Sequence, residues 1–256
     1  MNRNILLFIS CLCFTSLSGA KSWSQDQVVV AASAYLPPYV IPADNTGIQM
    51  EILKQAFKQQ GISNIVVRYM SNKRAELELK NGNVDVALNL PSSSPEHIYQ
   101  SDSLISYQNV AISLASKNYI IETIKGLSGK NVLAFQNAAG FLDAPFEEAK
   151  QAFSSYNEVV NQEAQVQHLM KNWVDVIILE RRIFLYYLNQ YEKSNPVFPY
   201  QIHPIFSQAP RPAFFNNEKL KNLFNKGLAS LVKSGKYRTI MIYNGTDYSN
   251  LDIHKF

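Results

Sequence analysis

The sequence has little cysteine and no long apolar segment. Its two cysteines, Cys11 and Cys13, lie near the amino terminus inside an apolar run over residues 5–17. A membrane-crossing helix takes about 20 apolar residues, so this run is too short to be one. The rest of the chain has no thiol, and we expect neither a disulfide nor a thiolate metal site in it. A chain of this length without such cross-links relies on buried apolar side chains for its stability.

Strong charge and the familiar catalytic motifs are missing as well. The 24 basic and 20 acidic residues give a net charge of +4 and are spread evenly, which does not favour nucleic-acid binding. The sequence contains no Gly-x-Ser-x-Gly, no phosphate-binding glycine loop and no His-Glu-x-x-His. Its four histidines do not have the spacing of metal ligands. We expect no metal, no cofactor, no nucleic-acid partner and no enzymatic activity.

The amino terminus has the pattern of a secretory signal peptide. Arg3 precedes the apolar run, and small residues follow the run. Cleavage after Ala20 or after Ser24 fits this pattern, and we place the signal peptide at residues 1–24. Removing it leaves about 230 residues with a net charge of about +2, because Arg3 and Lys21 are lost. We expect the product to be a free monomer in the periplasm.

Apolar runs alternate with segments of helical period along the rest of the chain. Continuous apolar runs predict buried strands at residues 28–32, 65–69, 84–88, 131–135 and 174–179. Apolar residues at helical spacing predict helices from Ile48 to Gly61, over residues 75–80, and over residues 220–232 with Asn216 or Asn217 as its cap. This order predicts two α/β lobes, each with a doubly wound, mostly parallel sheet.

Eight short stretches occur in the same order in a known family. They are residues 35–39 (YLPPY), 46–53 (TGIQMEIL), 81–86 (NGNVDV), 92–97 (SSSPEH), 101–104 (SDSL), 127–132 (LSGKNV), 174–176 (VDV) and 228–237 (LASLVKSGKY). Together they resemble the family 3 extracellular solute-binding proteins, whose best-known members deliver polar amino acids to ABC importers. The resemblance implies a type II periplasmic-binding-protein fold, in which two lobes close around a ligand by a hinge.

The resemblance also implies how the chain is divided. Residues 25–113 and 208–256 would form a discontinuous first lobe. Residues 114–207 would form a second lobe that is inserted between these two parts. Two crossing segments, near residues 112–117 and 203–210, would connect the lobes and act as the hinge.

The family site implies ligand contacts from the first lobe. Tyr35 and Tyr39 match a position where an aromatic side chain stacks on the ligand, or they are core or rim residues beside a proline turn. Ser92 matches a hydroxyl donor. His97 stands where amino-acid binders have an arginine that grips the ligand carboxylate through two N–H groups. Histidine lacks that fork, so His97 either contacts the ligand in another way or is an ordinary loop residue.

The second lobe departs from the family at two positions. Family members usually carry a threonine near Ala138 and Ala139 as a further carboxylate donor, and alanine has no hydroxyl. Glu180 matches the aspartate that receives the ligand ammonium group, so a carboxylate is kept with a longer reach. If it is buried, it needs a cation, either the ligand or Arg181 or Arg182. The alternative is a surface cluster of these charges, which would contribute little.

Three further charged residues lie next to predicted strands. Arg74 follows the second strand at a possible helix start, where it either faces the cleft or is solvated. Asp85 and Asp175 lie inside apolar strands and match residues that have a structural role in the family.

These observations predict a periplasmic solute-binding protein that captures a small polar ligand between its lobes for the membrane permease of an ABC importer. The altered carboxylate site widens the ligand class from amino acids to amines and related compounds. One alternative is a sensory module that presents its closed form to a membrane receptor. Another is a dehydratase-type enzyme in which Glu180 or His97 is the acid–base group.

Overall fold

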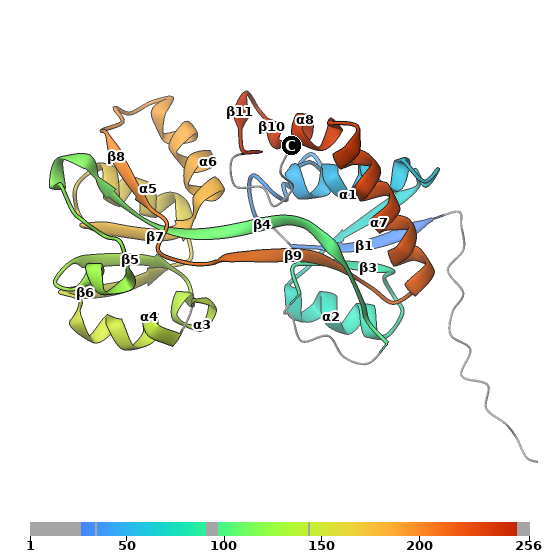
Figure 1. Ribbon diagram of the computed structural model, residues 1–256, viewed down its shortest axis with the longest axis horizontal. Coiled ribbons are helices and arrows are strands. Elements are labelled where there is room, and N and C mark those ends of the chain that lie inside the picture. Colours follow the sequence, from blue (N-terminus) through green and yellow to red (C-terminus); the bar gives the residue numbers. More distant parts are fainter. Residues whose placement is uncertain (1–26, 34, 91–96, 143, 250–256) are drawn as a thin grey trace, which may run out of the picture.

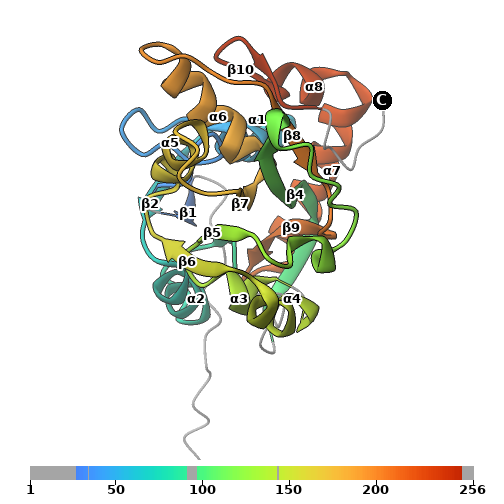
Figure 2. The same ribbon diagram turned by 90° about the vertical axis from the view of Figure 1, so that its left-hand side faces the viewer.

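The protein folds into two α/β lobes, which Figure 1 shows to the left and right of a shared pair of long strands. The computed structural model describes residues 27–33, 35–90, 97–142 and 144–249. The predicted signal peptide and Ser92 lie outside these residues. In Figure 2, which looks along the long axis, helices lie above and below the sheet of the second lobe. The predicted two-lobed α/β fold is therefore confirmed.

A parallel three-stranded unit forms the centre of each lobe. The strands are β1 (Val28–Ala32), β2 (Ile65–Tyr69), β3 (Val86–Leu88), β5 (Asn131–Phe135), β6 (Ser155–Val159) and β7 (Val176–Glu180). In the first lobe β1 lies between β2 and β3. In the second lobe β5 lies between β6 and β7 in the same way. Because helices cover both faces of these sheets, their central strands are continuous apolar runs.

Two antiparallel strands, β4 (Tyr99–Leu114) and β9 (Gln208–Phe215), lie side by side between the lobes (Figure 1), and β4 continues into the second lobe. The strand order is β2-β1-β3-β9-β4-β7-β5-β6, and β8 (Tyr200–His203) also pairs with β4. β4 pairs with β9 as far as Gln108 and with β7 from Asn109 onward. The lobes therefore meet near these two residues, ahead of the first predicted crossing segment. The lobe boundaries stay predictions.

Helices flank the sheets of each lobe. The first lobe contains α1 (Ile48–Lys58), α2 (Asn72–Lys80), α7 (Glu218–Lys233) and α8 (Lys236–Met241), followed by a hairpin of β10 (Ile242–Tyr243) and β11 (Thr246–Asp247). The second lobe contains α3 (Ala138–Phe141), α4 (Ala144–Ala149), α5 (Gln162–Met170) and α6 (Arg181–Glu192). Short 3₁₀ turns lie at Ala115–Lys117, Ile124–Leu127 and Lys150–Ala152.

The three predicted helices correspond to α1, α2 and α7, and α2 begins earlier than predicted, at Asn72. The apolar stripe of α7 is buried at Leu220, Phe224 and two later residues, and the Asn217 side chain accepts a hydrogen bond from the Leu220 N–H (3.0 Å). Of the two caps that the sequence allowed, Asn217 is the one used. Gly227 lies directly against the backbone of Ala56 in α1, where a larger residue would overlap the carbonyl group. This close contact holds the two longest helices of the first lobe together.

Asp85 and Asp175 have equivalent structural positions in the two lobes. The Asp85 carboxylate accepts a hydrogen bond from the Val29 N–H (2.8 Å), and the Asp175 carboxylate accepts one from the Asn131 N–H (2.9 Å). Each aspartate directly precedes a strand and ties it to the start of the neighbouring strand, which is a structural role. Burial raises the pKa of Asp175. The hydrogen bonds from Asn131 and Tyr119 and the charge of Lys117 together lower this pKa by more, so it lies below its usual range.

Candidate functional site

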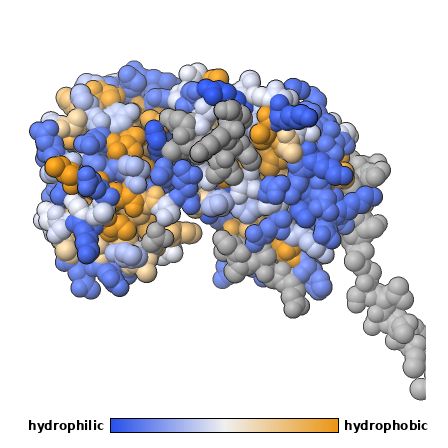
Figure 3. Space-filling model, viewed as in Figure 1, coloured by the Kyte–Doolittle hydropathy of each residue, from blue (hydrophilic) through white to orange (hydrophobic). Residues whose placement is uncertain are grey.

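A cavity of about 340 Å³ lies between the lobes, within the size range of small-molecule sites. Figure 3 shows the surface hollowed between the lobes on the lower edge of the view. The cavity is lined by Ser33, Tyr35, Leu36, Asn72 and Asn89 from the first lobe, by Tyr107, Asn109 and Arg211 from the two long strands, and by Phe135, Phe141, Gln162, Glu180 and Ile183 from the second lobe.

The topology explains why these residues meet. Ser33 and Asn89 follow directly after β1 and β3, and Phe135 and Glu180 are the last residues of β5 and β7. The carboxyl ends of parallel strands in α/β sheets open into a crevice between the connecting loops, where ligands bind. Here the crevices of the two lobes face each other across β4 and β9, so one cavity receives the strand ends of both.

A network of amide and hydroxyl groups fixes the wall of the first lobe. The Asn89 side-chain N–H donates to the Ser33 hydroxyl (3.1 Å), and its carbonyl oxygen accepts from the amide of Gln49 (3.1 Å). Gln49 is fully buried and also accepts from the Tyr107 hydroxyl (3.3 Å). Burial raises the pKa of Tyr107 well above its usual range, so the hydroxyl stays protonated. The network holds Asn89 and Tyr107 in fixed orientations beside the cavity.

Glu180 borders the cavity as the cap of α6. One of its carboxylate oxygens accepts hydrogen bonds from the N–H groups of Arg182 (2.8 Å) and Ile183 (3.0 Å). The other accepts from the Gln108 N–H (3.3 Å) and lies 3.9 Å from the Arg182 guanidinium. Burial raises the pKa of Glu180, and the charge of Arg182 opposes this rise. The carboxylate is thus supplied with a cation and three backbone N–H donors by the protein itself.

Arg182 ties the second lobe to the first. Its side chain is fully buried although it carries a charge. The Nε group donates to the carbonyl oxygen of Tyr248, which follows the β10–β11 hairpin (2.8 Å), and Nη1 donates to the carbonyl oxygen of Ser106 in β4 (2.7 Å). Of the two arginines that the sequence offered as partners of Glu180, Arg182 is the one that fills this place.

Arg211 brings a guanidinium to the cavity itself. It projects from β9 opposite Ile105 of β4, so Tyr107 is its diagonal neighbour on the same face of the sheet. The guanidinium lies 4.7 Å from the centre of the Tyr107 ring, and the buried ring of Tyr39 also stacks on Tyr107, 4.3 Å away. Stacking on a fixed aromatic ring orients the planar guanidinium without using its N–H groups.

The structure brings together two of the seven residues that the sequence nominated as ligand contacts. Tyr35 and Glu180 line the cavity. Tyr39 is fully buried and supports Tyr107 from the protein interior. The Arg74 side chain is 69% exposed and forms an ion pair with Glu78 one turn along α2 (3.4 Å), so it does not face the cavity.

His97 and Ala139 are not among the described residues that line the cavity. His97 is exposed and has a positive φ of 69°, as expected for a loop residue. Ala139 lies in α3, where its N–H donates to Glu158 (3.5 Å), and its neighbour Phe141 is the α3 residue that reaches the cavity. Ser92 lies outside the described residues, so its predicted contact stays a prediction.

The sequence interpretation missed most of the polar lining residues. Asn89 and Phe135 each stand at the end of a predicted strand, and this position alone would have nominated them. Arg211 directly follows the second predicted crossing segment, and its position next to a hinge segment would have nominated it as a residue between the lobes. Asn109 gave no signal, because its place depends on the point at which β4 changes its partner strand.

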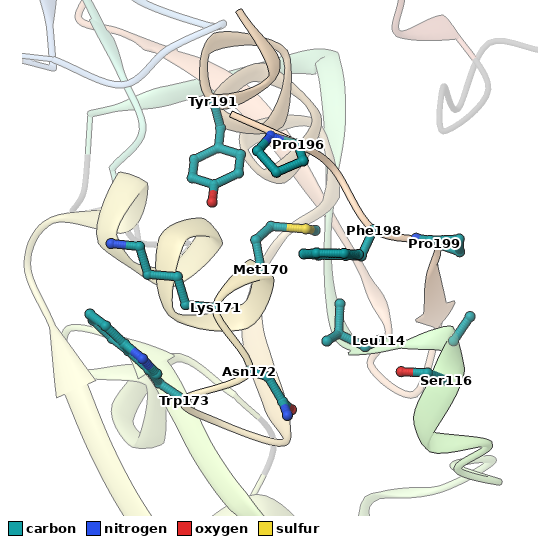
Figure 4. A pocket seen from close by; sticks show the side chains of 11 residues that line it. Leu114, Ser116, Met170, Lys171, Asn172, Trp173, Tyr191, Pro196, Phe198 and Pro199 are labelled. Atoms are coloured by element: carbon teal, nitrogen blue, oxygen red, sulfur yellow. The ribbon is translucent and has the colours of Figure 1, made fainter. Parts of the chain in front are cut away.

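A larger hollow of about 900 Å³ lies on the second lobe (Figure 4). Its walls carry aromatic and apolar side chains such as Trp173, Phe198, Met170 and Tyr191, and Lys171 lies 4.7 Å from the centre of the Trp173 ring. The described residues that line this hollow fall within residues 114–116, 170–173 and 191–199, so it does not collect the strand ends of both lobes. The cavity between the lobes is the better candidate for a polar solute.

The described residues contain neither a metal cluster nor a membrane helix. No three His, Cys, Asp or Glu side chains among them lie close enough together to bind a metal ion. No helix in this part of the chain has the length and apolar character that a membrane crossing requires.

The chain belongs to the bacterial extracellular solute-binding proteins, family 3, which it matches over residues 28–243. No curated protein matches it in sequence. The family is one of binding proteins, and its members bind small molecules.

Solved structures share the fold at low sequence identity. The YckB protein of Bacillus subtilis is 21% identical, with a TM-score of 0.67 over 88% of this chain and 93% of that chain. An ABC uptake transporter substrate-binding protein of Streptococcus pneumoniae with bound histidine is 20% identical, with a TM-score of 0.62 over 90% and 95%. The GluR0 ligand-binding core with L-glutamate is 17% identical, with a TM-score of 0.64 over 84% and 96%.

Proposed function

We propose that this protein captures a small polar solute in the cavity between its lobes and delivers it to the permease of an ABC importer. The observation that carries the proposal is a cavity whose lining residues come from the strand ends of both lobes. A ligand that contacts both walls stabilises the closed arrangement over the open one, because only the closed arrangement makes both sets of contacts. The protein acts by binding and release and catalyses no reaction.

The expected location is the periplasm, in agreement with the extracellular character of the family. Amino-acid binding by relatives supports an amino acid or a related compound as the solute, as in the Streptococcus pneumoniae protein with bound histidine. The monomeric state predicted from the sequence belongs to this proposal as well.

Thermal unfolding with a ligand panel tests solute capture. A ligand at 100 times its Kd stabilises the folded state by about 2.7 kcal/mol, which raises Tm by roughly 5–10 °C in a protein of this size. We expect at least one compound among amino acids, carboxylic acids, amines and short peptides to give such a shift. If these compounds and extracts of the native growth medium all leave Tm unchanged, the proposal is contradicted.

Ligand sensing is a second candidate function. The same fold supports it, because capture of a ligand between two lobes serves either function, and the GluR0 ligand-binding core in complex with L-glutamate shares this fold. A sensor would present its closed form to a membrane receptor instead of a permease. Pull-down of membrane proteins by the ligand-bound protein distinguishes the two functions, because an importer permease supports transport and a receptor supports sensing.

A further inference from the structure

Among the described residues, the cavity contains one charge that no other side chain balances. Arg211 and Glu180 are the described lining residues that are charged at neutral pH. The Glu180 carboxylate is occupied by the buried Arg182 and by three backbone N–H groups. No hydrogen bond or ion pair joins the Arg211 guanidinium to another described residue. The described part of the wall therefore presents the positive charge of Arg211 to the ligand.

The side chain of Arg211 is held ready to bind an anion. Its stem rises from β9 at the point where the two lobes meet, and its guanidinium stacks on Tyr107. Tyr107 is itself fixed by the ring of Tyr39 and by its hydrogen bond to Gln49. A guanidinium whose face is occupied by an aromatic ring still has its N–H edge free for a carboxylate.

The walls around Arg211 are aromatic. Phe135 and Phe141 of the second lobe lie with their ring centres 6.4 Å apart. Phe141 is 69% exposed and Tyr35 of the first lobe is 57% exposed, although both are large side chains that proteins usually bury. Exposed aromatic residues on both lobes of one cavity offer faces for a flat or apolar part of a ligand.

We propose that Arg211 is the carboxylate anchor of this cavity and that the ligand is a small carboxylate with a flat apolar group. The inference rests on the proposed function and narrows it. Arg211 then performs from β9 the task that the resemblance assigns to the position of His97. Because Arg182 already balances the charge of Glu180, a simple amine finds no free carboxylate and is a poor ligand. The proposal therefore excludes the amines that the sequence analysis had included in the ligand class.

Isothermal titration calorimetry with three matched probes tests the proposal. 3-Phenylpropanoate and phenethylamine share a phenylethyl group and differ in the sign of their charge, and L-phenylalanine carries both charges. We expect the two carboxylates to bind and phenethylamine to bind at least tenfold more weakly. Arg211→Gln keeps the stem on Tyr107 and removes the charge, so it should weaken carboxylate binding by about 10- to 100-fold. Arg211→Lys keeps the charge without the fork and should give an intermediate loss.

Arg68→Gln is the matched control, because Arg68 is an exposed arginine of β2 that donates to the Asn83 carbonyl and does not line the cavity. It should leave all three affinities unchanged. Each variant is first compared with the unmodified protein by thermal unfolding, and Arg211→Lys serves if Arg211→Gln does not fold. Because a guanidinium stays charged, carboxylate affinity should be constant between about pH 5.5 and 8.

Three results would overturn the inference. Phenethylamine binding as tightly as 3-phenylpropanoate would remove the charge preference. Carboxylate binding that is equal in the Arg211→Gln variant would remove the anchor. If none of the three probes binds, the aromatic-carboxylate class is wrong. Solute capture is decided separately by the broad ligand panel, so its failure and that of the inference are distinguishable.

Discussion

Replacement of Glu180 by alanine is expected to lower the free energy of unfolding by about 3–5 kcal/mol. The change leaves the fully buried guanidinium of Arg182 without its carboxylate, and it removes the acceptor of the N–H groups at the start of α6. Removal of one member of a buried charge pair lowers the free energy of unfolding by more than the intact pair adds to it, because the other charge stays buried without a partner. Urea denaturation followed by circular dichroism measures the loss.

Glu163→Ala is the control for this prediction. Glu163 lies in the first turn of α5, in the same lobe, and is exposed. Its replacement should change stability by no more than about 0.5 kcal/mol. The double variant Glu180→Ala with Arg182→Met should recover much of the loss, because it also removes the buried charge. Equal costs for the two glutamate variants would show that the buried pair is unimportant.

Gly47→Ala should destabilise the protein by about 3 kcal/mol and weaken ligand binding. Gly47 has φ 118° and ψ 152°, a region that other residues avoid, and a Cβ there would overlap the carbonyl group of Tyr39. The turn over residues 35–40 carries Tyr35 to the cavity and Tyr39 to the ring of Tyr107. A shift of this turn to relieve the overlap therefore reaches the site.

Gly61→Ala separates backbone strain from close packing. Gly61 also has a positive φ, 77°, but no atom lies within 4 Å of a Cβ built on it. Its replacement should cost about 1–2 kcal/mol through strain alone and leave ligand affinity unchanged. Denaturation midpoints and calorimetric affinities of the two variants make the comparison. Identical effects on stability and binding would mean that the contact of Gly47 with Tyr39 has no role.

Local patterns were sufficient to predict most of the central strands. Residues 28–32, 65–69 and 131–135 match β1, β2 and β5 as the structure has them. The two other predicted strands begin later than expected, at Val86 and Val176. Each starts directly after an aspartate whose carboxylate accepts a hydrogen bond from the neighbouring strand. The first two residues of each predicted strand therefore belong to the connection that leads into it.

The candidate site was less predictable, because it depends on the pairing of distant strands. Glu180 was nominated because the family resemblance matches it to an aspartate of the ligand site, and its neighbour Arg182 was one of two candidate partners. Only the fold shows that Arg182 points into the first lobe, toward Tyr248 and Ser106. Arg211 lies between two prolines, where hydrophobic periodicity does not indicate which way a side chain points. Its contact with Tyr107 depends on the register of β4 and β9, which the sequence does not give.

The most direct test of solute capture is a crystal structure with the tightest compound from the ligand panel. We expect the compound to lie in the cavity between the lobes, in contact with Asn109 and Arg211 of the long strands and with Phe141 of the second lobe. A compound that instead occupies the hollow of Trp173 and Phe198, or the outer surface of a single lobe, would contradict capture between the lobes.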